Sequence, residues 1–473
     1  MNHVPSVVLG GGIGGLQTAH LLAKAGLAPV LLESRGSCGG LVFGAPIGGV
    51  WVDLGAESFA KRSVATADLC IELGLDVVDP SGQSWLWSHR EGGFAVRIPH
   101  GVLGIPTDLD DPILPTLLSP EGLARAREDL TMGPDAGADA ADLATLVETR
   151  LGAEVLNRLV DPVAGGVHSA HPSQLSVDII SPGLRQAMVR EGSLVRAAAA
   201  LRASAPAGAV VSSASAGLFT LPRALASRII ELGGTVATRR VVTGIARDGE
   251  AWAITHHEAG RAPDPAAPPI PVGEPEVLTT DKLVVALDGR AALDLLRGVP
   301  ELEVGDWQLP QGADLAQVCL VLDAPALDAG PRGSGLLVTP EAEGAEKQVA
   351  CKAITHYSIK WPGVVAGTGK HVLRVSYGRA GVPTPEPTLA GALADASVLL
   401  GVDLAEDQVA GHTIVHFPNS LPPQTPAHRV RVRELADRLA DLPGLAITGA
   451  WYAGNGLAAV VADAARVANE LAR

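Results

Sequence analysis

The first forty residues alternate apolar runs with glycine-rich and polar turns. Ser6 to Leu9 is a short apolar run with β-branched residues, which is typical of a buried strand. From Leu16 to Ala25 the apolar residues recur at helical spacing, and Gly26 marks the end of that helix. A second apolar run, Ala28 to Leu32, again predicts a buried strand. The pattern therefore predicts one βαβ unit at the start of the chain.

The turn between this first strand and the helix is rich in glycine. Gly10, Gly12 and Gly15 occupy the G-x-G-x-x-G positions, which serve the tight turn, the approach of a pyrophosphate and close helix packing. The helix N-terminus offers free N–H groups and a partial positive charge to that phosphate. Glu33 follows roughly 20 residues further on, where a carboxylate accepts hydrogen bonds from ribose hydroxyls. Together these features predict an adenine dinucleotide as the ligand.

The middle of the chain contains both strand-like and helix-like patterns of apolar residues. A glycine-punctuated stretch after Gly40 predicts a hairpin, and the pattern turns helical from about residue 103 to residue 175. The clearest amphipathic helix there is DLATLVETRLGAEVLNRLV. Residues 202–217 are small and polar and predict a loop, whereas residues 221–245 predict a helix followed by a strand.

Strands are predicted on either side of residues 261–276, which read as a proline-rich surface connection. Several further strands are expected between residues 315 and 378. The segment that begins at Gly444 again reads as strand, glycine-rich turn and helix. Because both ends of the chain supply this element, we expect one nucleotide-binding domain that is interrupted by insertions.

Composition narrows the functional classes. The chain has 473 residues, of which 47% are apolar and 18% charged, so it can form a large core or an apolar cavity. Its net charge of −15 argues against a nucleic-acid partner, which needs a basic footprint. The four cysteines form no C-x-x-C pair, so neither a disulfide framework nor a zinc site is predicted. With no signal peptide or bilayer-spanning apolar run expected, we predict a cytoplasmic protein without a transmembrane segment.

Several motifs then resemble a known family. GGGIGG, DLGAES, RVVTGI and GAWYAGNGLAAVV occur in the order typical of FAD-dependent flavoproteins. LVDPVAGGVHSAHPSQLSVD, GLFTLPRALA, THYSIKWPG and LRVSYGR more narrowly resemble the oxygen-dependent coproporphyrinogen III oxidase and protoporphyrinogen oxidase family, in its actinobacterial type. The resemblance covers nearly the whole chain, although its FAD motifs are shared with amine oxidases and carotene desaturases.

This resemblance implies an α/β fold, in which an FAD-binding Rossmann-like domain is interrupted by a mixed α+β substrate domain with a helical lobe. The implied segments are residues 1–80, 213–292 and 425–473 for FAD binding, residues 81–100, 186–212 and 293–424 for the substrate domain, and residues 101–185 for the helical lobe.

The resemblance also assigns the cofactor site, with FAD held non-covalently because no cysteine stands in the C-terminal flavin segment. The glycine turn would bind the phosphates, Glu33 the ribose, the next segments the flavin, the Val242 backbone the adenine, and the last helix the pyrophosphate and isoalloxazine. The residues implied are Gly10, Gly11, Gly12, Ile13, Gly14, Gly15, Glu33, Gly40, Leu41, Gly55, Ala56, Glu57, Ser58, Val242, Asn455, Gly456 and Leu457.

The implied substrate lies between the helical lobe and a β-rich wall, and it is a porphyrinogen, oxidised by the flavin with molecular oxygen as acceptor. The residues implied at this wall are Gly166, Val167, His168, Leu337, Ile354 and Ser376. No side chain is expected to be catalytic and no metal is expected, because the His168–His171 pair lacks a third ligand. Lys360, Arg374 and Arg379 flank the wall and are candidates for binding propionates.

Coproporphyrinogen III is the expected substrate, for oxidation to coproporphyrin III with release of hydrogen peroxide in haem biosynthesis. Three alternatives stay open: protoporphyrinogen IX, amine oxidation, and a non-catalytic porphyrin-binding flavoprotein. Amine oxidases of this type commonly carry a lysine near the flavin, at the position that aligns with Val318 here. Contact with a membrane surface or with another haem-pathway enzyme is also left open.

Overall fold

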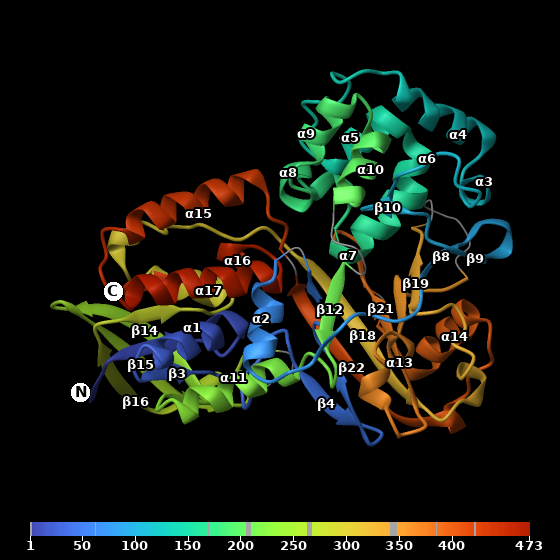
Figure 1. Ribbon diagram of the computed structural model, residues 1–473. Coiled ribbons are helices and arrows are strands. Elements are labelled where there is room, and N and C mark those ends of the chain that lie inside the picture. The colour runs from blue at the N-terminus through green and yellow to red at the C-terminus, as the bar shows by residue number, and fades with distance from the viewer. Residues whose placement is uncertain are drawn as a thin grey trace.

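The structure is a computed structural model, and it describes residues 2–61, 63–168, 170–204, 210–262, 267–340, 348–384, 386–420 and 422–473. Figure 1 shows a nucleotide-binding unit that contains both termini, a helical lobe above, and a unit built on a large sheet at the lower right. Segments far apart in the sequence meet in each unit. The site described below lies where these units face one another.

A parallel five-stranded sheet forms the centre of the nucleotide-binding unit. Its order is β13-β3-β2-β17-β23, so the start, the middle and the end of the chain all contribute. The strands are β13 (Thr235–Ala237), β3 (Pro29–Leu32), β2 (Ser6–Leu9), β17 (Leu283–Val285) and β23 (Leu445–Ile447). The short apolar runs form central strands because both faces of a parallel sheet are covered.

Helices cover one face of this sheet and a second sheet with more helices covers the other. Val8 and Val284 point into a core with α1, α11 and α17, whereas Val7 and Val285 point to the opposite core. The first group of helices is α1 (Ile13–Lys24), α2 (Ala65–Glu72), α11 (Thr220–Glu231) and α17 (Leu457–Leu471). The second group is α12 (Gly289–Leu296), α15 (Pro426–Leu439) and α16 (Ala450–Ala453). The predicted βαβ unit is confirmed, with its helix beginning three residues earlier than predicted.

The second sheet corrects the proline-rich connection predicted at residues 261–276. Its order is β1-β16-β15-β14, with β1 (Asn2–Val4), β16 (Ile270–Thr280), β15 (Ala251–Gly260) and β14 (Arg240–Asp248). Residues 270–276 therefore belong to a strand, although two of them are proline. Only the last three residues of β16 pair with β1. The rest of its outer edge is free of that strand, and proline is tolerated on a strand edge.

A seven-stranded sheet forms the third unit. Its order is β22-β18-β21-β20-β19-β8-β9, and α14 (Leu389–Leu400) packs on one face. The strands are β22 (Val409–Ser420), β18 (Ala313–Leu322), β21 (His371–Tyr377), β20 (Ala353–His356), β19 (Gly335–Val338), β8 (Ser84–Ser88) and β9 (Phe94–Arg97). The other face meets the hairpin of β4 (Gly44–Ile47) and β5 (Val50–Asp53), and α13 (Tyr357–Lys360).

The predicted loop at residues 202–217 is wrong in part. Residues 211–214 form β12 (Val211–Ala214), which pairs with both β6 (Phe59–Ala60) and β7 (Val77–Val78). Ser212 and Ser213 are buried in this strand. Pairing on both sides provides partners for the backbone N–H and C=O groups. These tertiary partners therefore hold a serine-rich stretch of low strand propensity in an extended conformation. Residues 205–209 of the predicted loop lie outside the described residues.

The helical lobe also differs from its prediction, because the long amphipathic helix is divided. α5 (Leu143–Leu151) ends at Gly152, whose φ of +86° departs from helical geometry. α6 (Ala153–Val155) then leads into a π-helix, η3 (Leu156–Gly165), and into α7 (Gly166–His168). The remaining helices of the lobe are α3 (Leu114–Leu117), α4 (Pro120–Arg127), α8 (Val177–Ile180), α9 (Leu184–Glu191) and α10 (Leu194–Ser204).

Candidate functional site

The glycine turn after β2 has one open position between two crowded ones. A Cβ at Gly10 would lie 2.5 Å from the carbonyl oxygen of Ala286, and a Cβ at Gly15 only 2.0 Å from that of Gly10. A Cβ at Gly12 would meet no atom within 4 Å. The outer glycines therefore permit the turn and the helix packing, while Gly12 leaves its backbone accessible to a ligand, as a pyrophosphate requires.

Glu33 is fixed beside this turn. One carboxylate oxygen accepts a 2.7 Å hydrogen bond from the backbone N–H of Gly11, and the other accepts one of 2.7 Å from Arg35. Each oxygen keeps further acceptor capacity for a ribose hydroxyl. The neighbouring Cys38 has its thiol pKa raised to about 12 by burial and by the charge of Glu33. A thiol whose pKa is raised in this way is a poor nucleophile, which fits a cofactor held without a bond to Cys38.

Two further segments close over the turn. The Gly39 N–H donates to the carbonyl of Gly11 at 2.7 Å, which places Gly40 and Leu41 next to Gly12. A Cβ at Gly55 would lie 1.9 Å from the Leu41 carbonyl oxygen, so only glycine fits there. The predicted residues Gly40, Leu41, Gly55 and Ala56 thus meet in one place. Leu41 is 54% exposed, an apolar side chain available to a ring system.

The C-terminal helix brings a second N-terminus to the same place. A Cβ at Gly14 would lie 3.2 Å from Val460, so the first turns of α1 and α17 touch, and Figure 1 shows the two helices side by side. Gly456 precedes α17, and a Cβ there would meet no atom within 4 Å. Leu457 begins the helix, and Asn455 donates from its side chain to the Pro422 carbonyl at 2.8 Å. Two helix N-termini near one open backbone favour an anionic pyrophosphate.

Val242, the residue predicted to contact the adenine, lies in the strand that begins next to Glu33. The N–H of Arg240, the first residue of β14, donates to the Glu33 carbonyl at 2.8 Å. Val242 follows two residues later, at an irregularity of the β14–β15 pairing. Val242, Glu33, Gly12, Gly40 and Leu41, which are among the residues predicted to bind the dinucleotide, therefore lie along one path.

Glu57 forms ion pairs with two of the cations that are candidates for binding propionates. Its carboxylate binds Lys360 at 2.6 Å and also the guanidinium of Arg374. Arg374 further donates to the Gly55 carbonyl at 2.6 Å and to Gln317 at 2.9 Å. Burial would raise the pKa of Glu57, but Lys360 and Arg374 lower it to about 2. Both cations are therefore engaged by Glu57 in the structure, whereas the sequence makes them candidates for binding propionates.

The strand register of the large sheet determines on which face of the sheet each predicted wall residue lies. Ser376 and Arg374 face Gln317, whereas Ile354 pairs with Val375 and is 2% exposed in the core under α14. Ile354 therefore lies in the core of the structure, whereas the resemblance places it at the substrate wall. Its neighbour Ala353 pairs with Ser376 and Leu337 on the opposite face.

The same alternation determines which side chain of β18 faces this part of the sheet. Val318 is fully buried in the core under α14, whereas Gln317 is the residue of β18 that faces Arg374 and Ser376. Sequence inspection missed Gln317 because side-chain direction in a strand depends on register.

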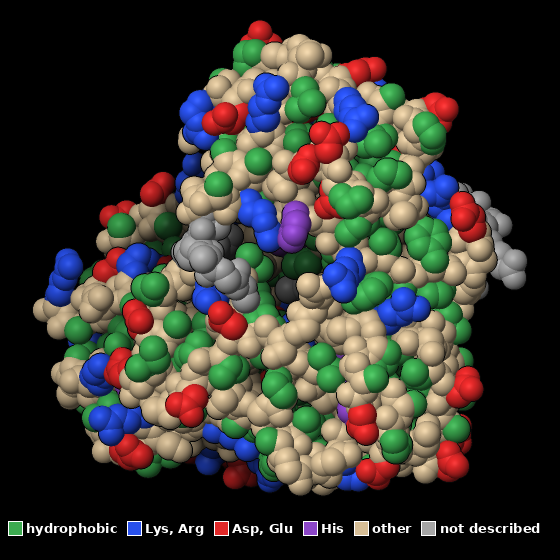
Figure 2. Space-filling view, turned by 45° about the vertical axis from the view of Figure 1, so that its right-hand side comes forward, with side chains coloured by type: hydrophobic (Ala, Val, Ile, Leu, Met, Phe, Trp, Pro, Cys, Tyr) green, Lys and Arg blue, Asp and Glu red, His purple; other side chains and the backbone are tan. Residues whose placement is uncertain are grey.

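The helical lobe closes against this face through its glycine segment. A Cβ at Gly166 would lie 3.4 Å from Leu337, so α7 and β19 are adjacent. Val167 is 64% exposed, and His168 ends α7. Figure 2 shows a hollow between the lobe and the rest of the molecule, with apolar side chains inside it and basic and histidine side chains at its rim.

The comparisons agree with a flavin cofactor. The model of the family described as flavin-containing amine oxidoreductase matches residues 13–473. The chain belongs to this family. Membership confirms the prediction of a flavin cofactor, and the dinucleotide path described above fits FAD. The chain is thus an oxidoreductase with a flavin cofactor, and segments from both ends and the middle of the chain meet at the glycine turn where this cofactor is predicted to bind.

Relatives and a solved structure extend the likeness over the whole chain. The coproporphyrinogen III oxidase of Bacillus subtilis (strain 168) is 23% identical over 472 residues, which cover 95% of this chain and 94% of the relative. That of Mycobacterium tuberculosis (strain ATCC 25618 / H37Rv) is 27% identical, covering 97% and 95%. A crystal structure from Exiguobacterium sp. 255-15, named as a protoporphyrinogen oxidase, superposes with a TM-score of 0.79 at 25% identity, covering 99% of this chain and 98% of that one.

Proposed function

We infer that this protein oxidises coproporphyrinogen III to coproporphyrin III, with oxygen as the acceptor and hydrogen peroxide as the second product, in haem biosynthesis. The observation that carries this proposal is the likeness to coproporphyrinogen III oxidases over 94–95% of the two relatives' lengths. It spans the lobe and the large sheet as well as the widely shared flavin motifs. Protoporphyrinogen IX is the second candidate, favoured by the name of the superposed Exiguobacterium structure.

When bound, FAD would accept a hydride from a CH₂ bridge in each of the three two-electron steps that separate a porphyrinogen from a porphyrin, and oxygen would reoxidise it after each step. The protein residues position the macrocycle between Leu337 and Ser376 on one side and Gly166 and Val167 on the other. Backbone carbonyls of the lobe segment accept hydrogen bonds from pyrrole N–H groups. Glu57 and Arg374 hold the Gly55 segment in place beside the flavin. No side-chain general base is required, because the substrate loses its protons from nitrogens that face acceptors.

One feature of the large sheet argues against amine oxidation. β18 carries no lysine, and the side chain that faces the site there is Gln317. A lysine-assisted amine oxidation therefore has no counterpart on this strand. Non-covalent FAD is supported by the burial-raised thiol pKa of Cys38 and of Cys319, each about 12. We place the reaction in the cytoplasm; within the described residues, every helix is too short or too polar to cross a bilayer.

The test compares both porphyrinogens as substrates of the purified yellow protein. Under anaerobic conditions coproporphyrinogen III should bleach the flavin, and air should restore its absorbance. With oxygen and catalase present, porphyrin fluorescence should give a higher kcat/KM for coproporphyrinogen III than for protoporphyrinogen IX. A higher value for protoporphyrinogen would promote the second candidate. Absence of bleaching by either would leave a porphyrin-binding flavoprotein without catalysis.

The cofactor assignment has its own test in Gly12→Val. The φ of Gly12 is −69° and a Cβ there meets no protein atom within 4 Å, so the variant should fold. Its branched side chain would occupy the space of the pyrophosphate, so FAD should be lost. Gly12→Ala is the matched control and should retain part of the flavin. A Gly12→Val protein with full flavin occupancy would show that the site is misplaced. Acid precipitation of the wild type should release free FAD, which tests the non-covalent linkage.

A further inference from the structure

One row of side chains crosses the large sheet on the face opposite α14. The register places one residue from each of four neighbouring strands in this wall row: Gln317, Ser376, Ala353 and Leu337. All four are half-buried. Their neighbours along the strands point the other way, into the core under α14: Val318, Val375, Ile354 and Leu336. The wall row therefore faces away from that core, and at Leu337 it meets the helical lobe.

Polar side chains occur at only one end of the wall row. The two residues at the lobe end are apolar, whereas Gln317 and Ser376 form the other end. Arg374 connects this polar end to the flavin segment: it donates to the side-chain oxygen of Gln317 at 2.9 Å and to the Gly55 carbonyl at 2.6 Å. The polar end therefore lies beside the segment that is predicted to line the flavin.

Arg374 fixes the orientation of the Gln317 amide. A guanidinium has only donors, so the amide oxygen faces it and the amide NH₂ group faces away. The Gln317 nitrogen donates one N–H to the Ser376 hydroxyl, at 3.4 Å. Within the part of the chain that the structure describes, the other N–H of Gln317 and the hydroxyl hydrogen of Ser376 have no acceptor. The polar end thus presents two hydrogen-bond donors from adjacent strands.

Only one kind of group on a porphyrinogen can accept these hydrogen bonds well. Its pyrroles carry N–H donors, and the nitrogen lone pairs belong to the aromatic rings. The CH₂ bridges and the methyl and vinyl groups have no acceptor atoms, so the carboxylates of the propionate arms are the only strong acceptors. Hydrogen bonds to an ionised acceptor are also stronger than those between neutral groups.

The two candidate substrates differ in these acceptors. Coproporphyrinogen III carries propionate arms at the two places where protoporphyrinogen IX carries vinyl groups. A protein that prefers coproporphyrinogen III must offer donors to at least one of these arms. In the wall row, such donors occur only at Gln317 and Ser376.

We propose that Gln317 and Ser376 bind the carboxylate of a propionate arm that coproporphyrinogen III has and protoporphyrinogen IX lacks. This inference rests on the proposed function and assigns its substrate preference to two residues. Arg374 acts as a positioning residue, because it holds the amide oxygen and so keeps the N–H groups toward the arm. A vinyl group in the same place would leave both donors without an acceptor, which lowers affinity.

The experiment measures binding of the two oxidised products, coproporphyrin III and protoporphyrin IX, to the FAD-loaded protein by fluorescence titration. Gln317→Glu keeps an oxygen for Arg374 but replaces the N–H donors by a second carboxylate oxygen. It should weaken binding of coproporphyrin III at least about tenfold, as expected for loss of a charged hydrogen bond. Ser376→Ala removes one donor and no charge and should weaken that binding roughly threefold to tenfold.

Binding of protoporphyrin IX should stay at the wild-type value in both variants, because its vinyl group makes no hydrogen bond there. For coproporphyrinogen III turnover, KM should rise by the same factor as the dissociation constant while kcat stays near the wild-type value. Equal losses for the two porphyrins, or unchanged binding of coproporphyrin III in both variants, would overturn the inference.

Controls separate this outcome from a folding or cofactor defect. Gln186→Glu makes the same change at an exposed position of α9 and should leave all constants unchanged. The flavin content and flavin absorbance spectrum of Gln317→Glu should match those of the wild type. A shifted flavin spectrum with unchanged porphyrin binding would assign the amide to the flavin and refute the proposal. If the wild type oxidises neither porphyrinogen, the proposed function fails, whereas the comparison of the two porphyrins still decides what Gln317 and Ser376 bind.

Discussion

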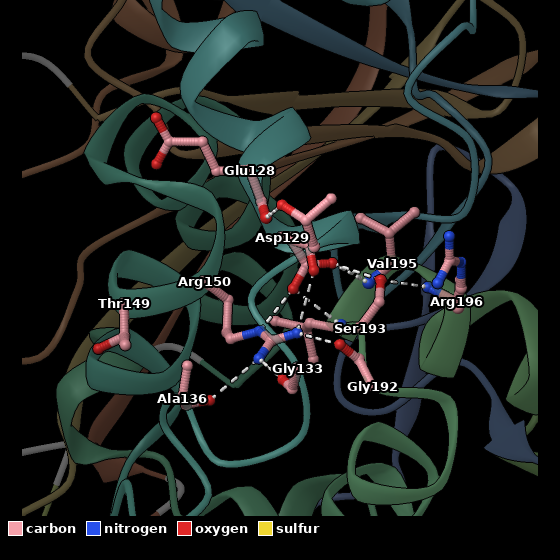
Figure 3. Close-up of polar contacts among 12 residues, drawn as sticks. Glu128, Asp129, Gly133, Ala136, Thr149, Arg150, Gly192, Ser193, Val195 and Arg196 are labelled. Atoms are coloured by element: carbon pink, nitrogen blue, oxygen red, sulfur yellow. Dashed lines mark hydrogen bonds and ion pairs between the residues drawn. The ribbon is translucent and has the colours of Figure 1, made fainter.

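Two buried carboxylate–guanidinium networks can be compared among the residues that the structure describes, one in the helical lobe and one beside the predicted flavin site. In the lobe, Asp129 and Arg150 form an ion pair in which both side chains are fully buried (Figure 3). Beside the flavin site, Glu57 pairs with Arg374, whose side chain is 5% exposed. The chemistry of the two pairs is the same, but their surroundings differ.

The lobe network is complete within one unit. Asp129 accepts hydrogen bonds from Ser193 and from the N–H groups of Leu194 and Val195 at the start of α10. Arg150 donates to the carbonyls of Gly133, at 2.6 Å, and Gly192, at 2.8 Å. Figure 3 shows these partners surrounding the guanidinium. Every partner named here lies between residues 129 and 195, so this network stabilises the lobe itself.

The Glu57 network instead joins two units. Glu57 and Gly55 belong to the segment after β5 that closes over the glycine turn, while Arg374 and Gln317 belong to the large sheet. A second cation, Lys360, comes from α13. The comparison indicates that a buried ion pair within one unit stabilises the fold of that unit. Loss of an ion pair between two units is expected also to displace the Gly55 segment beside the predicted cofactor site.

The largest effect should follow from Arg150→Met, which leaves Asp129 buried without its cation. We expect a loss of about 3–5 kcal/mol in the free energy of unfolding, typical of a broken buried pair. Thermal unfolding followed by circular dichroism checks the loss. The molecules that remain folded should keep their FAD, because no partner in this network touches the flavin site. Parallel loss of flavin would contradict the separation of the two networks.

Glu57→Gln should have a smaller effect on stability and a larger one on the cofactor. The variant loses charged hydrogen bonds to Lys360 and Arg374, which we estimate at about 2–3 kcal/mol. FAD should dissociate more readily, because the Gly55 segment loses its anchor. Flavin fluorescence released on dilution measures this. A stability loss with unchanged flavin affinity would make this network equivalent to that of the lobe.

At low pH the wild type and Glu57→Gln should differ less in their free energy of unfolding. The folded-state pKa of Glu57 is lowered to about 2 from an ordinary value of 4.5. Its contribution is therefore fully present above about pH 4.5 and is lost as the pH falls toward 2, because the unfolded state then binds the proton first. Urea unfolding midpoints of both proteins between pH 3 and 7 test the sign; a gap that widens toward low pH would refute it.

The smallest effect should come from Lys360→Met. The Lys360 side chain is 22% exposed, so solvent screens its ion pair, and we expect a loss of about 1 kcal/mol or less. Arg374 would still neutralise Glu57, so the flavin should be retained. Thermal unfolding and flavin content measured on the same samples check both statements. A loss as large as that of Glu57→Gln would show that Lys360, not Arg374, anchors the carboxylate.

The sequence by itself determined the local features of the site. The βαβ unit, the spacing of Gly10, Gly12 and Gly15, and Glu33 at the end of its strand depend on neighbours within a few tens of residues. Apolar periodicity and glycine placement report such short-range geometry directly. The helix that follows Gly456 was predictable for the same reason.

Only the tertiary structure decided which side chains face the site. Ile354 and Leu337 read alike in the sequence, but strand register sends one into the core and the other toward the lobe. Glu57 forms ion pairs with Lys360 and Arg374, which lie about three hundred residues further along the chain. Residues 211–214 form the strand β12 because they pair with β6 and β7. Strand register and long-range charge pairing are set by the packing of distant segments, and that packing has no periodic signature in the sequence.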